Sequence, residues 1–285
     1  MPDMMAELMV WAAGLILLGL VMVLIAQQRW EAGTLAKARD LFSCVPEDES
    51  GLVQESELEG LPDCVKQWLR RSGVIGQARI HRVKLIQSGR MRTAPDKPWL
   101  PFDAVHYANV DRPGFVWKAR VKVAPGIHML GLDRYCQGHG FMNIKLLGII
   151  PLVNAKPGPE MDKSTLLRYL AELIWYPTAA LNSYIQWEEI DQHSARAVMS
   201  WQGITAGMVF SFDEAGDLMS SVGKRYREIR SQYVLTDWGG VAAGCADFNG
   251  RRITNRTDVV WKLESGDFNW MQVEVTAIEY NPPGI

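Results

Sequence analysis

The segment "FVWKARVKV", residues 115–123, sets the pattern from which the fold of this chain can be predicted. Its odd positions are apolar and its basic residues fall at even positions: Phe115, Trp117, Ala119, Val121 and Val123 against Lys118, Arg120 and Lys122. A period of two indicates a β-strand with one buried face. Because strands of parallel sheets are usually apolar on both faces, this alternation favours an antiparallel sheet.

Similar alternating runs occur along the chain, separated by turn signals such as "DEAGD" at 213–217. They cover residues 81–90, 102–109, 128–136, 184–190, 195–201, 207–213, 218–228, 257–264 and 268–280. No long helical segments alternate with these runs, which argues against parallel βαβ units. We therefore predict an α+β, mainly β fold: a large curved antiparallel sheet or half-barrel of about ten strands.

Residues 162–176 depart from this pattern and predict one helix across a face of the sheet. Their apolar side chains have helical spacing: Leu166, Leu167, Leu170, Leu173 and Ile174. Asp162 is expected to cap the first turn. The helix should end at Tyr176, because Pro177 disfavours a helical conformation at the residue before it.

Residues 8–26, "LMVWAAGLILLGLVMVLIA", contain no charge and no proline. A helix of this length spans roughly 28 Å, the thickness of a bilayer core. A cleaved signal peptide would need basic residues before the apolar stretch, and residues 1–7 carry only the charges of Asp3 and Glu7. We predict an uncleaved single-pass anchor that binds the membrane through residues 8–26.

The chain is predicted to have three parts: a transmembrane anchor at 1–30, a helical extension and polar linker at 31–60, and a single β-rich globular domain at 61–285. Arg29, Lys37 and Arg39 follow the anchor, and no basic residue precedes it. The positive-inside rule therefore favours a cytoplasmic globular domain.

The composition excludes several classes of function. Thirty basic and 32 acidic side chains leave a formal charge of −2, so no nucleic-acid-binding surface is expected. The chain has no Walker A loop, GxSxG elbow, HExxH motif or complete GxGxxG fingerprint. Its five histidines are scattered, so we predict no metal site and no cofactor. Cys44, Cys64, Cys136 and Cys245 form no CxxC pair, and their disulfide state stays open.

The strongest candidate for a site is the flank of the predicted helix that carries Arg168, Glu172 and Trp175. Side chains four residues apart on a helix are neighbours, so Arg168 and Glu172 can pair. On an exposed face this would be a weak surface ion pair. On the concave side of the sheet the pair would be desolvated and would need further partners. The second interpretation predicts that the pair holds a polar head group while aromatic side chains hold an apolar tail.

Four more residues complete the candidate ligand-binding set: Tyr169 beside Arg168, Trp117 on the apolar face of 115–123, and Asp133 with Tyr135 before a glycine-rich turn. The segment 131–152 around the last two is otherwise interpreted as a β-hairpin that leads to an apolar edge. Asp133 and Glu172 also form a conceivable carboxylate pair for hydrolysis.

Several motifs together resemble a bacterial, often membrane-anchored family of unknown function: "LPDCVKQWLRRSGV", "PGFVWKAR", "LDRYCQGHG", "RYLAELIWYPTAAL" and "FNGRRI" with "VVWKLESGDF". The likeness covers most of residues 61–280. The β-rich pattern is also similar to lipoprotein-carrier (LolA-like) half-barrels, a likeness of fold that does not transfer function. Basic residues before the anchor of such relatives would put the domain outside the cell membrane, and for this chain we favour the extracytoplasmic side against the positive-inside rule.

Three functions are compatible with these features. The first is a membrane-tethered protein, not an enzyme, that holds a lipid or other amphipathic molecule in a half-barrel cavity of at least several hundred Å³. The second is an envelope hydrolase that uses acidic residues near Glu172. The third is a non-catalytic structural or assembly protein with an exposed apolar patch and no cavity. Protein partners are not predicted by any motif.

Overall fold

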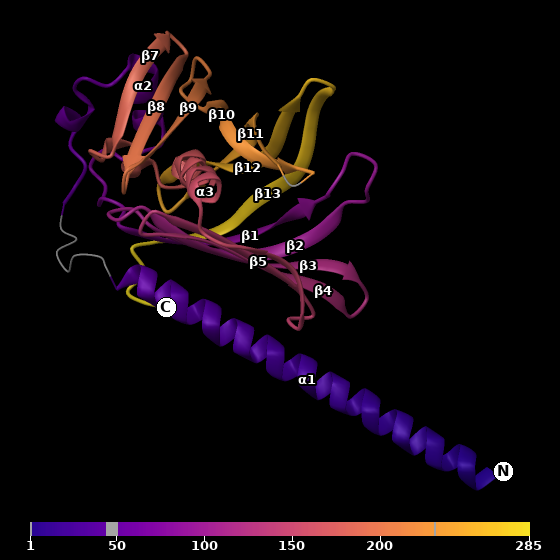
Figure 1. Ribbon diagram of the computed structural model, residues 1–285. Helices are drawn as coiled ribbons and strands as arrows, with labels where there is room; N and C mark the ends of the chain where they lie inside the picture. Colours follow the sequence, from indigo (N-terminus) through magenta and orange to yellow (C-terminus); the bar gives the residue numbers. More distant parts are fainter. Residues whose placement is uncertain (1, 44–50, 231) are drawn as a thin grey trace.

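The computed structural model describes residues 2–43, 51–230 and 232–285, and it confirms the predicted mainly β fold. One open, strongly curved antiparallel sheet holds thirteen strands in the order β6-β5-β4-β3-β2-β1-β13-β12-β11-β10-β9-β8-β7 (Figure 1). Neighbours in the sheet are neighbours in the chain, except that β1 pairs with β13. β6 and β7 lie at opposite edges of the sheet although they are consecutive in the chain, so the segment between them has to cross from one edge to the other.

The strands have the following bounds: β1 (Arg82–Met91), β2 (Leu100–Asn109), β3 (Gly114–Ala124), β4 (Ile127–Cys136), β5 (His139–Leu146), β6 (Ile150–Ala155), β7 (Ile185–Asp191), β8 (Ser194–Trp201), β9 (Ile204–Phe212), β10 (Leu218–Ile229), β11 (Gln232–Phe248), β12 (Arg251–Leu263) and β13 (Gly266–Tyr280). The predicted alternating runs did not include β5, β6 and β11, although the interpretation of 131–152 as a β-hairpin agrees with the antiparallel pair β4–β5. β11 contains Gly239, Gly240 and Gly244, and glycine is depleted in strands. β6 is an edge strand with mostly exposed side chains, so it lacks a one-sided alternation.

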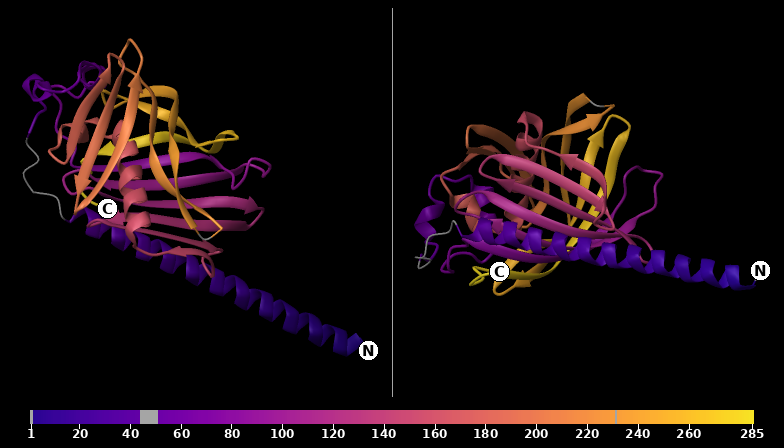
Figure 2. Two further views of the ribbon diagram at one scale, coloured as in Figure 1. Left: turned by 45° about the horizontal axis from the view of Figure 1, so that its top comes forward. Right: turned by 60° about the horizontal axis from the view of Figure 1, so that its bottom comes forward.

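The connection from β6 to β7 runs through the concave side of the sheet. It consists of α3 (Pro159–Ala171) and two short 3₁₀ helices, η2 (Glu172–Trp175) and η3 (Pro177–Leu181). α3 contacts β4 and β5 on one side of the curve and β9 and β10 on the other (Figure 2). The predicted helix across one face of the sheet is therefore present, and it divides the inside of the half-barrel.

The expected role of Asp162 as a helix cap is wrong. α3 begins at Pro159, one turn earlier than predicted, so Asp162 lies inside the helix. Its carboxylate accepts a hydrogen bond from the backbone N–H of Gly140, with an N–O distance of 2.7 Å, and lies 3.2 Å from Nδ1 of His139. Asp162 thus joins α3 to the start of β5.

The long N-terminal helix α1 (Pro2–Phe42) packs its C-terminal part against the convex face of β2 and β3. This contact forms a second apolar cluster, separate from the main core, of Ala38, Leu41, Phe42, Tyr107, Val116 and Leu132. The Asn109 side-chain amide also donates a hydrogen bond to the carbonyl oxygen of Leu41, with an N–O distance of 2.8 Å. Lys118, on the basic face of β3, forms an ion pair with Glu31 of α1.

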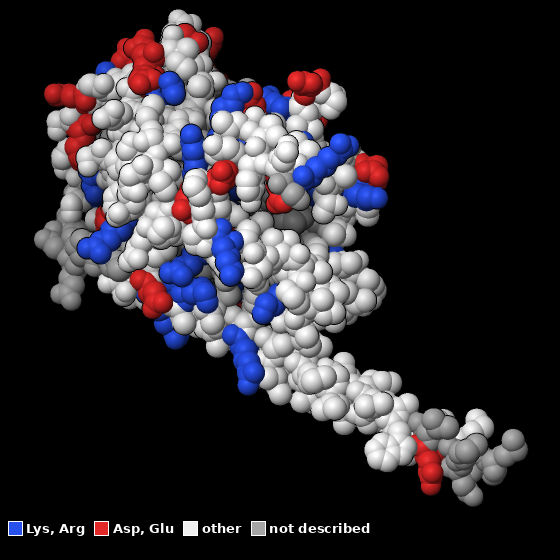
Figure 3. All heavy atoms as spheres, in the orientation of Figure 1, with Lys and Arg blue, Asp and Glu red and all other residues white. Residues whose placement is uncertain are grey.

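The N-terminal part of α1 extends away from the sheet (Figure 1), and its apolar side chains are exposed. The helix from Met9 to Phe42 is long and apolar enough to cross a membrane. Lys and Arg side chains gather where this helix leaves the globular part (Figure 3).

Residues before β1 cover one end of the half-barrel. They form a short 3₁₀ helix, η1 (Glu55–Leu58), and the helix α2 (Asp63–Arg71). Val53 and Leu58, which fall in the segment predicted as a linker, are buried in the main core. Trp68 of α2 stacks on Phe212 of β9 with ring centroids 5.7 Å apart.

The substitution Gly239→Ala tests the close approach of β10 and β11. A Cβ atom at Gly239 would lie 1.7 Å from the carbonyl oxygen of Ser221, so the two strands would have to separate. We expect the free energy of unfolding to fall by about 1–3 kcal/mol, as for other overpacked sites. Urea unfolding of the full chain, followed by circular dichroism, measures this change.

The matched control is Gly131→Ala. A Cβ atom there would meet its nearest neighbour at 3.9 Å, an ordinary contact, so little change is expected. Equal stability of the two variants would contradict this account of the sheet.

Candidate functional site

A cavity of about 230 Å³ lies between the helical connection and the concave face of the sheet. Its walls are mainly aromatic and thioether side chains: Trp117, Trp175, Trp238 and Trp270 with Met91, Met129, Met142 and Met271. The volume is smaller than the several hundred Å³ predicted, and smaller than the roughly 300–1,000 Å³ of sites that enclose a whole drug-sized ligand. The cavity suits a small molecule or one part of a larger one. Methionine side chains are flexible, so these walls can adapt to an occupant.

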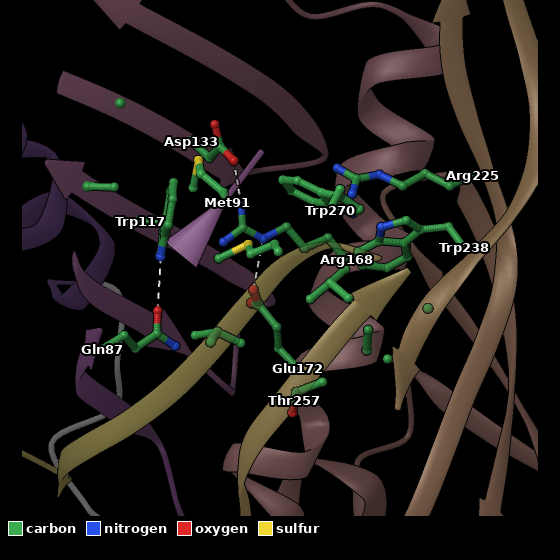
Figure 4. A pocket seen from close by; sticks show the side chains of 18 of the residues that line it. Gln87, Met91, Trp117, Asp133, Arg168, Glu172, Arg225, Trp238, Thr257 and Trp270 are labelled. Atoms are coloured by element: carbon green, nitrogen blue, oxygen red, sulfur yellow. Dashed lines mark hydrogen bonds and ion pairs between the residues drawn. The ribbon is translucent and has the colours of Figure 1, made fainter. Parts of the chain in front are cut away.

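Arg168 lies at one wall of this cavity and holds two carboxylates (Figure 4). Its Nε donates a hydrogen bond to Oε1 of Glu172 at 2.8 Å, and its Nη1 donates to Oδ2 of Asp133 on β4. The guanidinium also lies over the rings of Phe115 and Trp117, with Cζ 4.7 and 5.0 Å from their centroids. The predicted pair of Arg168 and Glu172 is therefore on the concave side, with the additional partners that a desolvated pair requires.

Burial and charge have opposite effects within this cluster. Burial raises the pKa of Asp133 and Glu172, and the positive charge of Arg168 opposes that rise. Burial alone would lower the pKa of Arg168, but Glu172 and Asp133 raise it above its ordinary value. Each charge in the cluster is thus stabilised mainly by the others, since little water reaches them.

His106 lies behind this cluster as a neutral side chain. Burial lowers its pKa well below the ordinary value, and Arg168 lowers it further. Its Nε2 is 3.4 Å from Oε2 of Glu172, and its ring packs edge-on against Trp175 with centroids 5.8 Å apart. The ring is fully buried, so it cannot take up a charge without strong compensation.

Arg225 of β10 is a second cation at the cavity (Figure 4). Burial lowers its pKa to about 10, and Arg168 contributes to the decrease, so Arg225 keeps its charge at neutral pH. Its Cζ lies 4.5 Å from the ring centroid of Trp238. Within the described part of the chain, Arg225 forms no ion pair with a carboxylate. The cavity therefore has one cation whose charge the protein does not neutralise by direct contact.

Several residues that line the cavity also carry buried polar atoms without a hydrogen-bond partner among the described residues. Four of these atoms can donate a hydrogen bond, and one, Oε2 of Glu172, can only accept when ionised. The four donors are Nε2 of Gln87, Nε1 of Trp238, Nε1 of Trp270 and Oγ1 of Thr257. The other amide atom of Gln87, Oε1, accepts a hydrogen bond from Nε1 of Trp117 at 2.9 Å. Buried polar groups are normally paired, so this excess of donors fits a ligand that supplies acceptors.

The structure brings five of the seven predicted site residues to the cavity: Trp117, Asp133, Arg168, Glu172 and Trp175. Tyr169 and Tyr135 lie in the core instead. The Tyr169 hydroxyl donates to the carbonyl oxygen of Asn109 at 3.1 Å, and the fully buried Tyr135 packs beside Phe115. A helix turns successive residues to different faces, so Tyr169 cannot share the flank of Arg168.

Arg225 and Trp238 were missed by the sequence analysis. Arg225 has the same parity in β10 as the buried Ser221 and Gly223, so it is a charged residue at an inward-facing position. That signal was present in the sequence but was not used. Trp238 lies in β11, which was not predicted as a strand.

Within residues 2–43, 51–230 and 232–285, no group of three His, Cys, Asp or Glu side chains is arranged to hold a metal ion. Cys64, Cys136 and Cys245 are free thiols. Cys44 lies outside the described residues.

The substitution Arg168→Leu tests the charge cluster. It removes the common partner of two buried carboxylates, and breaking a buried ion pair in this way costs about 3–5 kcal/mol. We expect a loss of this size in the free energy of unfolding, measured by urea denaturation. Glu172→Gln is the control, because Arg168 then still binds Asp133, and its loss should be clearly smaller. If both variants lost only a small and equal amount of unfolding free energy, the three charges would not stabilise one another as described.

Two solved structures are similar to this chain over about three quarters of its length. The chain resembles a LolA superfamily protein from Nitrosomonas europaea (TM-score 0.42, 8% identity, 76% of this chain and 94% of that chain). It also resembles a DUF1329 family protein from Desulfovibrio piger (TM-score 0.35, 8% identity, 76% and 92% of the two chains). No curated protein sequence matches the chain.

Residues 51–273 match the model of a family of unknown function, DUF6544. This range includes α2, α3 and every residue that lines the cavity. It confirms the predicted membership in an uncharacterised family. The chain belongs to the DUF6544 family.

Proposed function

We propose that this protein is a membrane-tethered binding protein that holds the apolar chain and anionic head of an amphipathic molecule in its half-barrel. The observation that carries the proposal is the composition of the cavity wall. Tryptophan and methionine side chains surround the space, and Arg225 lines it without an ion pair to any carboxylate of the described ranges. Apolar walls with a small number of oriented polar groups are the usual form of a ligand site.

The polar atoms that line the cavity favour a ligand whose head group carries a negative charge. A carboxylate or phosphate accepts hydrogen bonds, and Gln87, Trp238 and Trp270 have donors without an acceptor among the residues that the structure describes. An anion would also neutralise Arg225, because burial and the nearby Arg168 lower the pKa of this guanidinium. A cationic head group would be repelled by Arg225 and could use only the unpaired Oε2 of Glu172.

The tether in this proposal is α1, crossing the cell membrane once, with residues 1–30 as the anchor and the family domain on the extracytoplasmic side. The exposed apolar surface of its N-terminal part supports a membrane-spanning role. The side of the membrane rests on the resemblance to anchored relatives.

The hydrolytic alternative has less support from the same residues. Arg168 binds both Asp133 and Glu172, so neither carboxylate is available as a free general base. The nearby His106 is neutral and fully buried. The cluster is better suited to holding α3 in place than to proton transfer.

A pair of probes with the same chain and opposite charges tests the proposal. Octanoate and octylamine are titrated into the full chain in nanodiscs, and the intrinsic tryptophan fluorescence is followed. We expect octanoate to bind more tightly than octylamine, and Arg225→Gln to remove most of this preference. Equal affinities for the two probes would contradict an anionic head group.

Cavity-filling variants separate binding in the cavity from partition into lipid. Gly131→Leu places a side chain in the open space beside Trp117, and Ala171→Leu does the same from α3. Both should abolish the octanoate response while circular dichroism shows a retained fold. Val241→Phe adds bulk at an exposed position of β11 and should leave binding unchanged. Unaltered binding in both filled variants would overturn the proposal.

A further inference from the structure

Exposed apolar side chains gather at one end of the half-barrel. Outside α1, most of the large exposed apolar residues of the described chain belong to three hairpins: Val123 and Ile127 of β3–β4, Ile149, Ile150 and Leu152 of β5–β6, and Ile229, Tyr233, Val234 and Leu235 of β10–β11. Figure 1 shows these hairpins on the side toward which the N-terminal part of α1 points. Clusters of this kind on a soluble surface normally mark an interaction site.

The β5–β6 hairpin is directly beside the point where the apolar stretch of α1 ends. A Cβ atom at Gly148, in the turn of this hairpin, would lie 3.5 Å from backbone atoms of Ala26 and Gln27. Ala26 is the last residue of the uncharged stretch 8–26. If α1 crosses a bilayer with this stretch, Ile149 and Ile150 are held at the depth of the bilayer surface.

Charges near this hairpin match an anionic lipid surface. A groove of about 560 Å³ between α1 and the β5–β6 side of the sheet is lined by Arg29, Lys37 and Lys145. The ammonium of Lys145 lies 5.7 Å from the ring centroid of Trp30. Basic side chains next to a membrane-spanning helix favour anionic head groups, and tryptophan favours the interface itself.

We infer that the tips of the β3–β4 and β5–β6 hairpins rest in the surface of the same bilayer that α1 crosses, so that the open end of the half-barrel faces lipid. The inference rests on the membrane-spanning part of the proposed function. It adds an occupant for the exposed apolar tips, namely the bilayer itself. A rigid contact between α1 and the sheet fixes the depth of the tips, because the second apolar cluster prevents free rotation of the domain about its tether.

This orientation gives the cavity a direct route to lipid. Val121, Met129 and Ile144 line the cavity and lie near the ends of β3, β4 and β5 that lead into the two hairpins. An amphipathic molecule could then pass from the bilayer to the cavity without exposing its chain to water. Arg168 of α3, Glu172 of η2 and Asp133 of β4 line the same cavity.

Hydroxyl-radical footprinting of the unmodified full chain tests the inference without any substitution. The chain is reconstituted in vesicles of phosphatidylethanolamine and phosphatidylglycerol, and side-chain oxidation is measured by mass spectrometry. Ile150 and Ile190 are a matched pair, because both are 52% exposed in the protein. Ile190 lies on the β7–β8 hairpin, away from the N-terminal part of α1 (Figure 1).

We expect oxidation of Ile150 to be several-fold slower than oxidation of Ile190, with Leu152 protected like Ile150. Equal rates at Ile150 and Ile190 would overturn the inference. The oxidation rates of Leu15 to Leu18 in α1 test separately whether this helix crosses the membrane. If these residues are protected while Ile150 is not, the docked orientation fails and the membrane span stands. If they are oxidised freely, the proposed membrane tether fails as well.

Discussion

The buried contact of Arg168 with Asp133 and Glu172 determines how the inside of this half-barrel is divided. Glu172 follows α3 directly and Asp133 belongs to β4, so one guanidinium fixes the end of the helix to the wall of the sheet. The same group covers the rings of Phe115 and Trp117. Because Arg168 forms the ion pairs that compensate both buried carboxylates, the helix cannot shift toward the sheet and close the cavity without separating these pairs.

Much of the sheet could be predicted from local patterns. The alternation in 115–123 identified β3 and its inward face, and nine further runs identified most of the other strands. Val116 shows the limit of this approach: it lies on the basic face of β3 and is buried only because α1 packs over it. β11 was missed because its glycines allow a close approach to β10 that no sequence period reveals.

The candidate site could be predicted only in part, because helical spacing reveals local pairs but not contacts between distant segments. Arg168 and Glu172 are close in sequence, so helical spacing was enough to pair them. Asp133 was suggested by its position before a turn, but its contact with Arg168 depends on how far the sheet curves. Arg225 could have been found from its inward-facing position in the run 218–228, but the sequence does not show that β10 forms a wall of the cavity. Distant contacts of this kind depend on the tertiary fold.

In the proposed function, the cavity beside Arg168 binds the chain of an anionic amphiphile, and Arg225 binds its head group. A crystal structure of the full chain grown with bromine-labelled octanoate tests it most directly, because bromine gives an anomalous signal. We predict an anomalous peak among Trp117, Met129 and Trp270, with the carboxylate at Arg225. A peak confined to the groove beside α1, or no peak within the half-barrel, would contradict the claim.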